Sequence, residues 1–182
     1  MAGGLVLTGR PGVGKTTVIV EVVKLLRGRD VSVGGFISRE VRDKGVRIGF
    51  EVIDLASGGR GWLARAGVGN GPRIGRYTVC LKSFEEVGVS ALHDALDRRD
   101  VDIVVVDEVG PMEMCSDRFK SSIKALFGGV KPYIATLHRS LVGTPLIPGN
   151  VEVMEVTFGN RNRMAGEVAE KAYRLAKGSE AG

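Results

Sequence analysis

The sequence predicts an α/β domain whose mostly parallel β-sheet is flanked by helices and carries an antiparallel hairpin insertion. Short apolar runs alternate with segments of helical periodicity along the 182 residues, which is typical of this fold class. A glycine-rich loop, GRPGVGKT at residues 9–16, separates the first apolar run from the first helical segment. Because 43% of the residues are hydrophobic, we expect one domain, residues 1–182, with a sizeable core.

Each element is predicted from its local pattern. Apolar and β-branched runs predict strands at residues 5–8, 31–38, 77–81, 103–106, 133–137 and 151–156. Helical periodicity predicts helices at residues 15–28, 83–98, 117–127 and 164–175, the second of them opened by a capping box at Ser83 and Glu86. Asp43-Lys44-Gly45 predicts the turn of a hairpin over residues 39–55. Residues 57–76 are rich in glycine and arginine, and we expect a loop there.

The loop at residues 9–16 has the G-x-x-x-x-G-K-[ST] pattern of a P-loop. Its glycines let backbone amides surround phosphate oxygens, and the following helix directs its partial positive charge at the same oxygens. Lys15 is expected to reach the β- and γ-phosphates, and the Thr16 hydroxyl is expected to bind Mg²⁺. The nucleotide-binding residues predicted in this segment are Gly9, Arg10, Pro11, Gly12, Val13, Gly14, Lys15, Thr16 and Thr17.

A second candidate segment, VDIVVVDEVG at residues 101–110, places two acids at the end of a buried strand. Asp107 is expected to hold Mg²⁺ together with Thr16. Glu108 is the candidate general base for a water aimed at the γ-phosphate, and Glu113 is its rival.

Other strand ends are expected to join this site, because ligands bind at the carboxyl ends of parallel strands. Thr136 and His138 lie at the end of one such strand, and residues 157–162 follow the last one. His138 either senses the γ-phosphate or positions water, or it is a strand-end histidine with a structural role.

The composition argues against several classes of protein. No apolar stretch approaches the ~20 residues of a membrane helix, and we expect no secretory signal. The only cysteines, Cys80 and Cys115, lack metal-type spacing and indicate a reduced, cytoplasmic protein. We also expect a monomer. The net charge of +5 would suit nucleic acid, but no Lys/Arg block or interleaved aromatic residues support that partner. The absence of Gln and the low content of Asn indicate a heat-adapted source.

Five stretches, LTGRPGVGKTT, GGFISREVRDKGVRIGFEVIDL, RIGRYTVCLKSFE, IVVVDEVGPMEM and VTFGNRN, occur in this order over most of the chain. Together they resemble the THEP1-type nucleoside triphosphatases, a family of P-loop NTPases. The resemblance implies a RecA-like core, in which another strand lies between the P-loop strand and the strand that ends at Asp107. It also implies Mg²⁺-dependent hydrolysis of ATP, GTP, CTP or UTP to the diphosphate. The nucleotide-binding segments that it implies are residues 9–16 and 103–110, and the strand end favours Asp107, Glu108, Val109 and Gly110 as the contacts in the second segment.

One position departs from the family pattern, since Pro111 stands where many relatives carry Lys. If that Lys neutralises phosphate charge, another cation must do so here. Arg161 is the first candidate for such an arginine finger, and its alternative role is to cap or solvate the last helix. The other candidates are the hairpin arginines Arg39, Arg42 and Arg47.

The predicted function is therefore a Mg²⁺-dependent nucleoside-triphosphate phosphohydrolase with broad base tolerance. The sequence contains no Asn-Lys-x-Asp motif that reads guanine, which argues against a GTP-specific switch. The alternative is a small-molecule or nucleotide kinase that uses the same P-loop, with the arginine-rich stretch from Arg60 to Arg76 as a lid over the acceptor.

Overall fold

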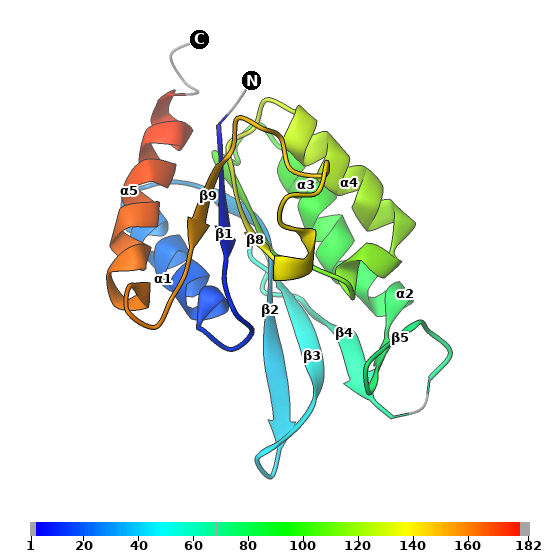
Figure 1. Cartoon of the computed structure of the whole chain (residues 1–182). Coiled ribbons are helices and arrows are strands. Elements are labelled where there is room, and N and C mark those ends of the chain that lie inside the picture. Colours follow the sequence, from blue (N-terminus) through cyan, green and yellow to red (C-terminus); the bar gives the residue numbers. More distant parts are fainter. Residues whose placement is uncertain (1–2, 68, 179–182) are drawn as a thin grey trace.

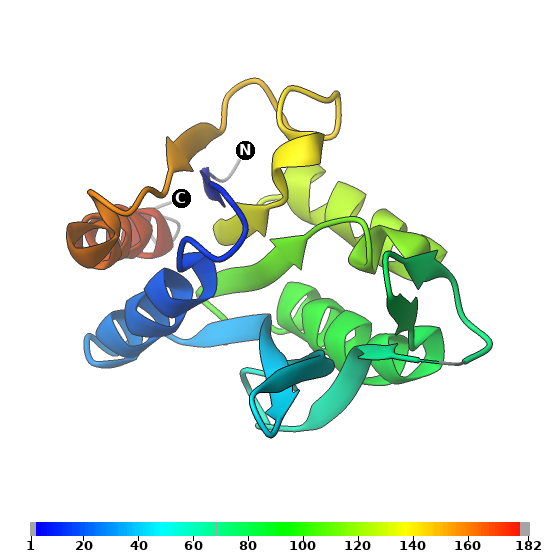
Figure 2. The same cartoon turned by 60° about the horizontal axis from the view of Figure 1, so that its bottom comes forward.

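The computed structural model describes residues 3–67 and 69–178. Within these residues, one nine-stranded sheet has helices on both faces (Figures 1 and 2). The strands are β1 (Gly4–Thr8), β2 (Val33–Asp43), β3 (Val46–Asp54), β4 (Arg60–Ala66), β5 (Arg73–Ile74), β6 (Tyr77–Val79), β7 (Ile103–Val109), β8 (Tyr133–Leu137) and β9 (Glu152–Glu155). The α-helices are α1 (Lys15–Arg27), α2 (Leu81–Phe84), α3 (Ser90–Asp97), α4 (Asp117–Gly128) and α5 (Arg161–Gly178). A π-helical turn at Glu85–Val89 joins α2 to α3, and 3₁₀ turns span Glu113–Cys115 and Arg139–Leu141.

The strand order is β5-β6-β4-β3-β2-β7-β8-β1-β9. Strands β2, β7, β8, β1 and β9 pair in parallel, and β3, β4, β6 and β5 extend the sheet with antiparallel pairs. Strand β8 lies between β1, which leads into the P-loop, and β7, which carries the two acids. The predicted α/β class, with a parallel RecA-like core and an antiparallel hairpin, is thus confirmed.

Strand β7 is buried on both faces of the sheet, which explains its continuous run of β-branched residues. Ile103 and Val105 face the core beneath α1 and α5, whereas Val104 and Val106 face the core beneath α3 and α4. None of the four exposes measurable surface. Each such side chain contributes roughly 1.5–3 kcal/mol on burial, so the core holds β7, and the acids at its end, firmly in place.

The predicted hairpin is confirmed, and its first strand is the continuation of the core strand β2. Lys44 and Gly45 form the turn with φ angles of 46° and 80°, the left-handed pair that a two-residue hairpin turn requires. In Figure 1 the hairpin projects beyond the P-loop end of the parallel strands. Strands β3, β4, β6 and β5 therefore form one antiparallel extension next to the P-loop.

The prediction of a loop over residues 57–76 is wrong where β4 and β5 form. Leu63 and Ala64 of β4 are buried, and β4 pairs with both β3 and β6. These tertiary contacts outweigh the low strand propensity of the nearby glycines.

The predicted capping box is also wrong, because the helix begins earlier, at Leu81. Ser83 therefore lies inside α2. Its hydroxyl accepts a 2.8 Å hydrogen bond from the backbone N–H of Trp62. The side chain that looked like a helix cap instead joins α2 to β4.

The described residues contain neither a disulfide nor a membrane-spanning helix. Cys80 and Cys115 are both free thiols, and burial raises the pKa of each. No helix in this part of the chain combines the length and apolar character needed to cross a bilayer.

Candidate active site

Residues 9–16 form a loop between β1 and α1, as the P-loop pattern predicts. Gly12 and Gly14 adopt φ angles of 77° and 105°, which other residues adopt only with strain. Gly14 is the N-cap of α1, so the amino end of this helix is directed at the loop. Backbone amides and helix dipole are therefore placed to bind an anion.

Lys15 extends from the first turn of α1 along the inside of the loop. Its Nζ donates a 3.3 Å hydrogen bond to the carbonyl of Gly9 and lies 3.7 Å from Oε2 of Glu108. Only 9% of Lys15 is exposed. A mostly desolvated ammonium group at this position can hold phosphate oxygens strongly.

Thr16 and Asp107 are in direct contact, although they come from different elements. Thr16 Oγ1 donates a 2.7 Å hydrogen bond to one carboxylate oxygen of Asp107, and Thr136 Oγ1 donates a 2.5 Å bond to the other. Burial raises the pKa of Asp107, and the bonds from Thr136 and Thr16 offset part of that rise. The sequence predicts Thr136 at this edge of the sheet, and the structure adds that its hydroxyl orients Asp107.

The hydroxyl of Thr16 and the carboxylate of Asp107 are oxygen ligands of the kind that Mg²⁺ prefers. The residues of the described chain include no cluster of three or more His, Cys, Asp or Glu side chains that could hold a metal ion. This pair nevertheless fits Mg²⁺, because that ion keeps several waters and binds through one or two protein groups together with substrate phosphates.

Glu108 and Glu113 converge on Gly110. A Cβ atom added to Gly110 would lie 2.9 Å from Oε1 of Glu108 and 3.0 Å from Oε2 of Glu113. Burial raises the pKa of Glu108, and the positive charge of Lys15 opposes that rise. Glu113 is only 4% exposed, and burial together with the charge of Glu108 raises its pKa well above 4.5. The pKa values of both acids are therefore raised, and that of Glu113 is raised further.

His138 lines the cleft beside these acids and also has a structural role. It is the N-cap of the 3₁₀ turn after β8, where its side chain accepts from the backbone N–H of Ser140 at 3.2 Å. Burial lowers the pKa of His138, and the nearby charges of Lys15 and Arg139 lower it further. The ring is therefore neutral at physiological pH.

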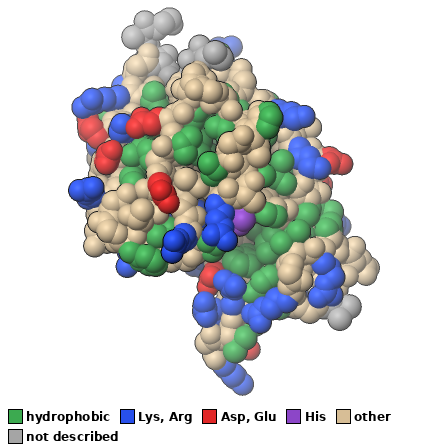
Figure 3. Space-filling view, viewed as in Figure 1, with side chains coloured by type: hydrophobic (Ala, Val, Ile, Leu, Met, Phe, Trp, Pro, Cys, Tyr) green, Lys and Arg blue, Asp and Glu red, His purple; other side chains and the backbone are tan. Residues whose placement is uncertain are grey.

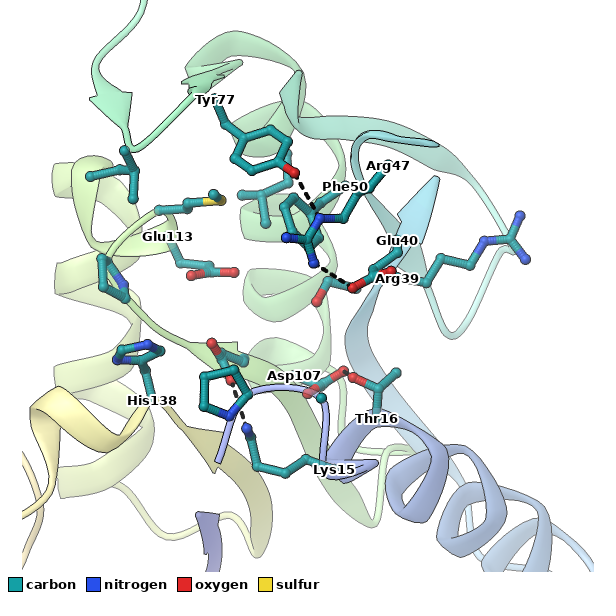
Figure 4. Close-up of a pocket in the computed structure, with 18 of the residues that line it drawn as sticks. Lys15, Thr16, Arg39, Glu40, Arg47, Phe50, Tyr77, Asp107, Glu113 and His138 are labelled. Atoms are coloured by element: carbon teal, nitrogen blue, oxygen red, sulfur yellow. Dashed lines mark hydrogen bonds and ion pairs between the residues drawn. The ribbon is translucent and has the colours of Figure 1, made fainter. Parts of the chain in front are cut away.

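The four candidate arginines lie in different places. Arg161 begins α5 and donates a 3.4 Å hydrogen bond to the carbonyl of Val13, but it is not among the residues that line the cleft. Arg47 lines the cleft and faces the P-loop across it (Figure 4). Arg39 also lines the cleft, yet its guanidinium points away and pairs with Glu51. Arg42 pairs with Glu40 at 2.8 Å.

The cleft has a volume of about 590 Å³, and most of the predicted nucleotide-binding residues line it. Those that line it are Pro11, Gly12, Gly14, Lys15, Thr16, Thr17, Asp107 and Glu108. Val13 and Val109 are instead buried in the two cores, so only their backbones remain available to a ligand. Gly9, Arg10 and Gly110 do not line it either.

The opposite wall of the cleft comes from the antiparallel extension, whose arginines were candidates for a finger or a kinase lid but whose apolar residues were not predicted as part of the site. It includes Phe50, Leu63, Ile74, Arg76 and Tyr77. Figure 3 shows hydrophobic side chains beside Lys and Arg side chains where the hairpin meets the body of the molecule. No local motif marks these residues, and only the pairing of β3, β4 and β6 brings them to the P-loop.

Comparison with known proteins is consistent with this architecture. A sequence profile of the family described as NTPase matches residues 4–169. The nucleoside-triphosphatase THEP1 of Thermofilum pendens is 40% identical over 179 residues, which cover 96% of this chain and 97% of the relative. The nucleoside-triphosphatase THEP1 of Archaeoglobus fulgidus is 41% identical over 166 residues, with coverage of 89% and 94%.

Two solved structures share the fold. The crystal structure of THEP1 from the hyperthermophile Aquifex aeolicus has a TM-score of 0.78 at 26% identity and covers 94% of this chain and 99% of its own. The solution structure of a human cancer-related nucleoside triphosphatase has a TM-score of 0.77 at 34% identity, with coverage of 93% and 97%. Together with the P-loop, the Thr16–Asp107 contact and the inserted strand β8, these matches show that the chain belongs to the THEP1 family of nucleoside triphosphatases.

Proposed function

We propose that this nucleoside triphosphatase depends on Mg²⁺ and converts ATP, GTP, CTP and UTP to the diphosphate and phosphate. The observation that carries the proposal is the 2.7 Å contact between Thr16 and Asp107 beside a buried Lys15. A hydroxyl, a carboxylate and an ammonium group thereby meet at the amino end of α1. This is the set of groups that positions a triphosphate with its metal ion.

Thr16 and Asp107 are the proposed Mg²⁺ ligands. The metal ion would neutralise charge on the β- and γ-phosphates. Thr136 supports the site because its hydrogen bond orients the Asp107 carboxylate. Lys15 supplies further positive charge from the P-loop side.

Glu108 is the proposed general base. It is 24% exposed and lies 3.7 Å from Lys15, so it borders the position of the γ-phosphate. Water oxygen would attack the γ-phosphorus and give its proton to the Glu108 carboxylate, while the bond to the β–γ bridging oxygen breaks and the diphosphate leaves. Glu113 suits this role less well, because burial and the charge of Glu108 raise its pKa and favour its protonated form.

An arginine is proposed to stabilise negative charge on the transferred phosphoryl group. Arg161 is the first candidate, because its guanidinium contacts the P-loop backbone at Val13. Arg47 is the main alternative, because it lines the cleft opposite Lys15. Phosphoryl transfer depends mostly on positioning and charge neutralisation, so either contact would affect turnover more than affinity.

Broad base tolerance is proposed because the predicted contacts are to phosphates, which are common to all four nucleotides. A cytoplasmic location, a monomeric state and a heat-adapted source stay predictions from the sequence alone. A second candidate function, a kinase, is favoured by one observation, namely that the cleft continues beyond the P-loop residues to Phe50 and Tyr77.

The test is phosphate release from each of the four ribonucleoside triphosphates, with Mg²⁺ and with excess chelator. We expect all four to be hydrolysed and activity to disappear with chelator. Activity on one base only would contradict the tolerance, and full activity in chelator would contradict the metal dependence. The same assay with added small-molecule acceptors and phosphorus NMR detection tests the kinase, which predicts a new phosphate ester in place of free phosphate.

A further inference from the structure

The cleft is divided between two sets of residues with different chemistry. One half is formed by the P-loop and the end of β7, and it accounts for the triphosphate. The other half is formed by the antiparallel extension, with Met112 closing it from the loop after β7. The triphosphate chemistry proposed above uses only Arg47 from this second half, as an alternative finger, and leaves its other residues without a role.

The second half presents an aromatic surface. The rings of Phe50 and Tyr77 lie 5.2 Å apart between centroids and are inclined by 67°. Leu63 lies behind them with 2% of its surface exposed. Figure 4 shows both rings on the side of the cleft opposite Lys15. Apolar and aromatic walls with a few polar groups are typical of small-molecule subsites.

Two guanidinium groups are fixed at this aromatic surface by one phenol. Arg47 donates to Tyr77 Oη at 2.7 Å and Arg76 donates to the same oxygen at 3.1 Å. Their guanidinium carbons lie 5.6 Å and 5.2 Å from the centre of the Tyr77 ring. Arg76 also donates to the backbone carbonyl of Arg47 at 2.5 Å. Two rotamer-rich side chains are thus already ordered, which lowers the entropic cost of binding.

The charges in this half do not balance. Arg47 pairs with Glu40 at 2.6 Å, and Glu40 is shared with Arg42. Arg76 forms no ion pair with any residue in the described part of the chain. A surplus positive charge therefore lies beside an apolar surface, an arrangement that favours an anion with an apolar body.

We propose that the extension half of the cleft binds a small planar organic anion, whose ring packs on Phe50 and Tyr77 and whose carboxylate or phosphate pairs with Arg76 and Arg47. The position of this anion next to the γ-phosphate rests on the proposed function, but the subsite itself does not.

The experiment measures binding of benzoate and 2-naphthoate by isothermal titration calorimetry, with benzyl alcohol as the neutral analogue. We expect both anions to bind saturably, and benzyl alcohol to bind at least tenfold more weakly. Arg76→Ala and Phe50→Leu should each weaken binding of the anions at least tenfold. Arg73→Ala is the matched control, because Arg73 lies on the same short hairpin, is exposed and does not line the cleft.

Lys15→Ala separates this proposal from the proposed function. That variant should lose hydrolysis but bind 2-naphthoate with unchanged affinity, because Lys15 belongs to the other half of the cleft. Circular dichroism confirms that each variant is folded, and Tyr77→Phe, which keeps the ring but releases both guanidinium groups, provides a milder second variant. The proposal is overturned if neither anion binds saturably, if benzyl alcohol binds as tightly, or if folded Arg76→Ala and Tyr77→Phe proteins bind with parent affinity.

Discussion

Thr16 Oγ1 donates a 2.7 Å hydrogen bond to Asp107 Oδ2 across 91 positions of the sequence. The contact joins the amino end of α1 to β7, although β8 separates β7 from the strand that leads into α1. It is mostly sheltered from solvent, since Asp107 is 1% exposed. The hydroxyl and the carboxylate are therefore held in place before any ligand arrives, which is the preorganisation that phosphoryl transfer requires.

Replacing Lys15 with alanine should abolish turnover and weaken triphosphate binding. The loss of one charged donor at a site of developing negative charge typically costs about 10²–10³ in rate. The fold should survive, because the polar partners of Lys15 Nζ in the described part of the chain are the Gly9 carbonyl and Glu108, both in the cleft rather than in a hydrophobic core. Phosphate release measures turnover and circular dichroism checks the fold. Unchanged phosphate release would show that Lys15 is not a catalytic residue.

Replacing Thr16 with alanine should raise the Mg²⁺ concentration needed for half-maximal activity. The substitution removes the hydroxyl that lies against Asp107, whereas Thr16→Ser keeps it and serves as the matched control. Asp107→Asn should act like Thr16→Ala, since it removes the negative charge of the pair. Mg²⁺ titrations of phosphate release measure the effect, and identical titration curves for Thr16→Ala and Thr16→Ser would rule out the proposed ligand.

Replacing Glu108 with glutamine should reduce turnover by at least about two orders of magnitude while triphosphate binding persists, as expected for loss of a general base. Glu113→Gln should have a much smaller effect, because burial and the charge of Glu108 favour the protonated form of Glu113, which Gln resembles. Single-turnover kinetics and nucleotide titration separate the two quantities. If Glu113→Gln is the slower variant, the roles of the two acids must be exchanged.

The arginine finger is tested with Arg161→Ala, Arg47→Ala, Arg39→Ala and Arg42→Ala. A finger contributes about 10³–10⁵ to turnover, and its loss should lower turnover far more than nucleotide affinity. We expect this signature for Arg161 or Arg47, and near-parent rates for Arg39 and Arg42, whose guanidinium groups pair with Glu51 and Glu40. If all four variants turn over at the parent rate, Lys15 and Mg²⁺ must stabilise the negative charge on the transferred phosphoryl group.

Replacing Glu113 with glutamine should increase stability at about pH 7 but not at about pH 4. The folded chain raises the pKa of Glu113 well above 4.5, so it retains a proton that the unfolded chain releases. The free energy of unfolding of the parent therefore falls as pH rises from about 4.5 towards the folded pKa, by about 1.4 kcal/mol for each unit of pKa difference. The Glu113→Gln variant has no titrating group at this position, so its free energy of unfolding does not fall in this way. Urea unfolding at the two pH values measures the difference, and equal gains at both would show that charge is not the cause.

The features that can be predicted from the sequence are those that depend on local backbone conformation and periodicity. The P-loop needs glycine φ angles and a following helix, both of which neighbouring residues encode. The Lys44-Gly45 turn likewise follows from its own two residues. The buried strand before Asp107 is marked by its β-branched run, because a strand covered on both faces has no polar side.

Only the tertiary structure decided which distant segments meet. Strand β4 forms within a glycine-rich segment because Leu63 and Ala64 are buried between β3 and β6. Ser83 bonds to β4 rather than capping a helix, and Glu113 is buried against Gly110. The Tyr77 hydroxyl accepts hydrogen bonds from Arg47 of β3 and from Arg76 next to β6. These contacts depend on strand order and register, which arise from burial summed over the whole sheet and leave no pattern in any one stretch of sequence.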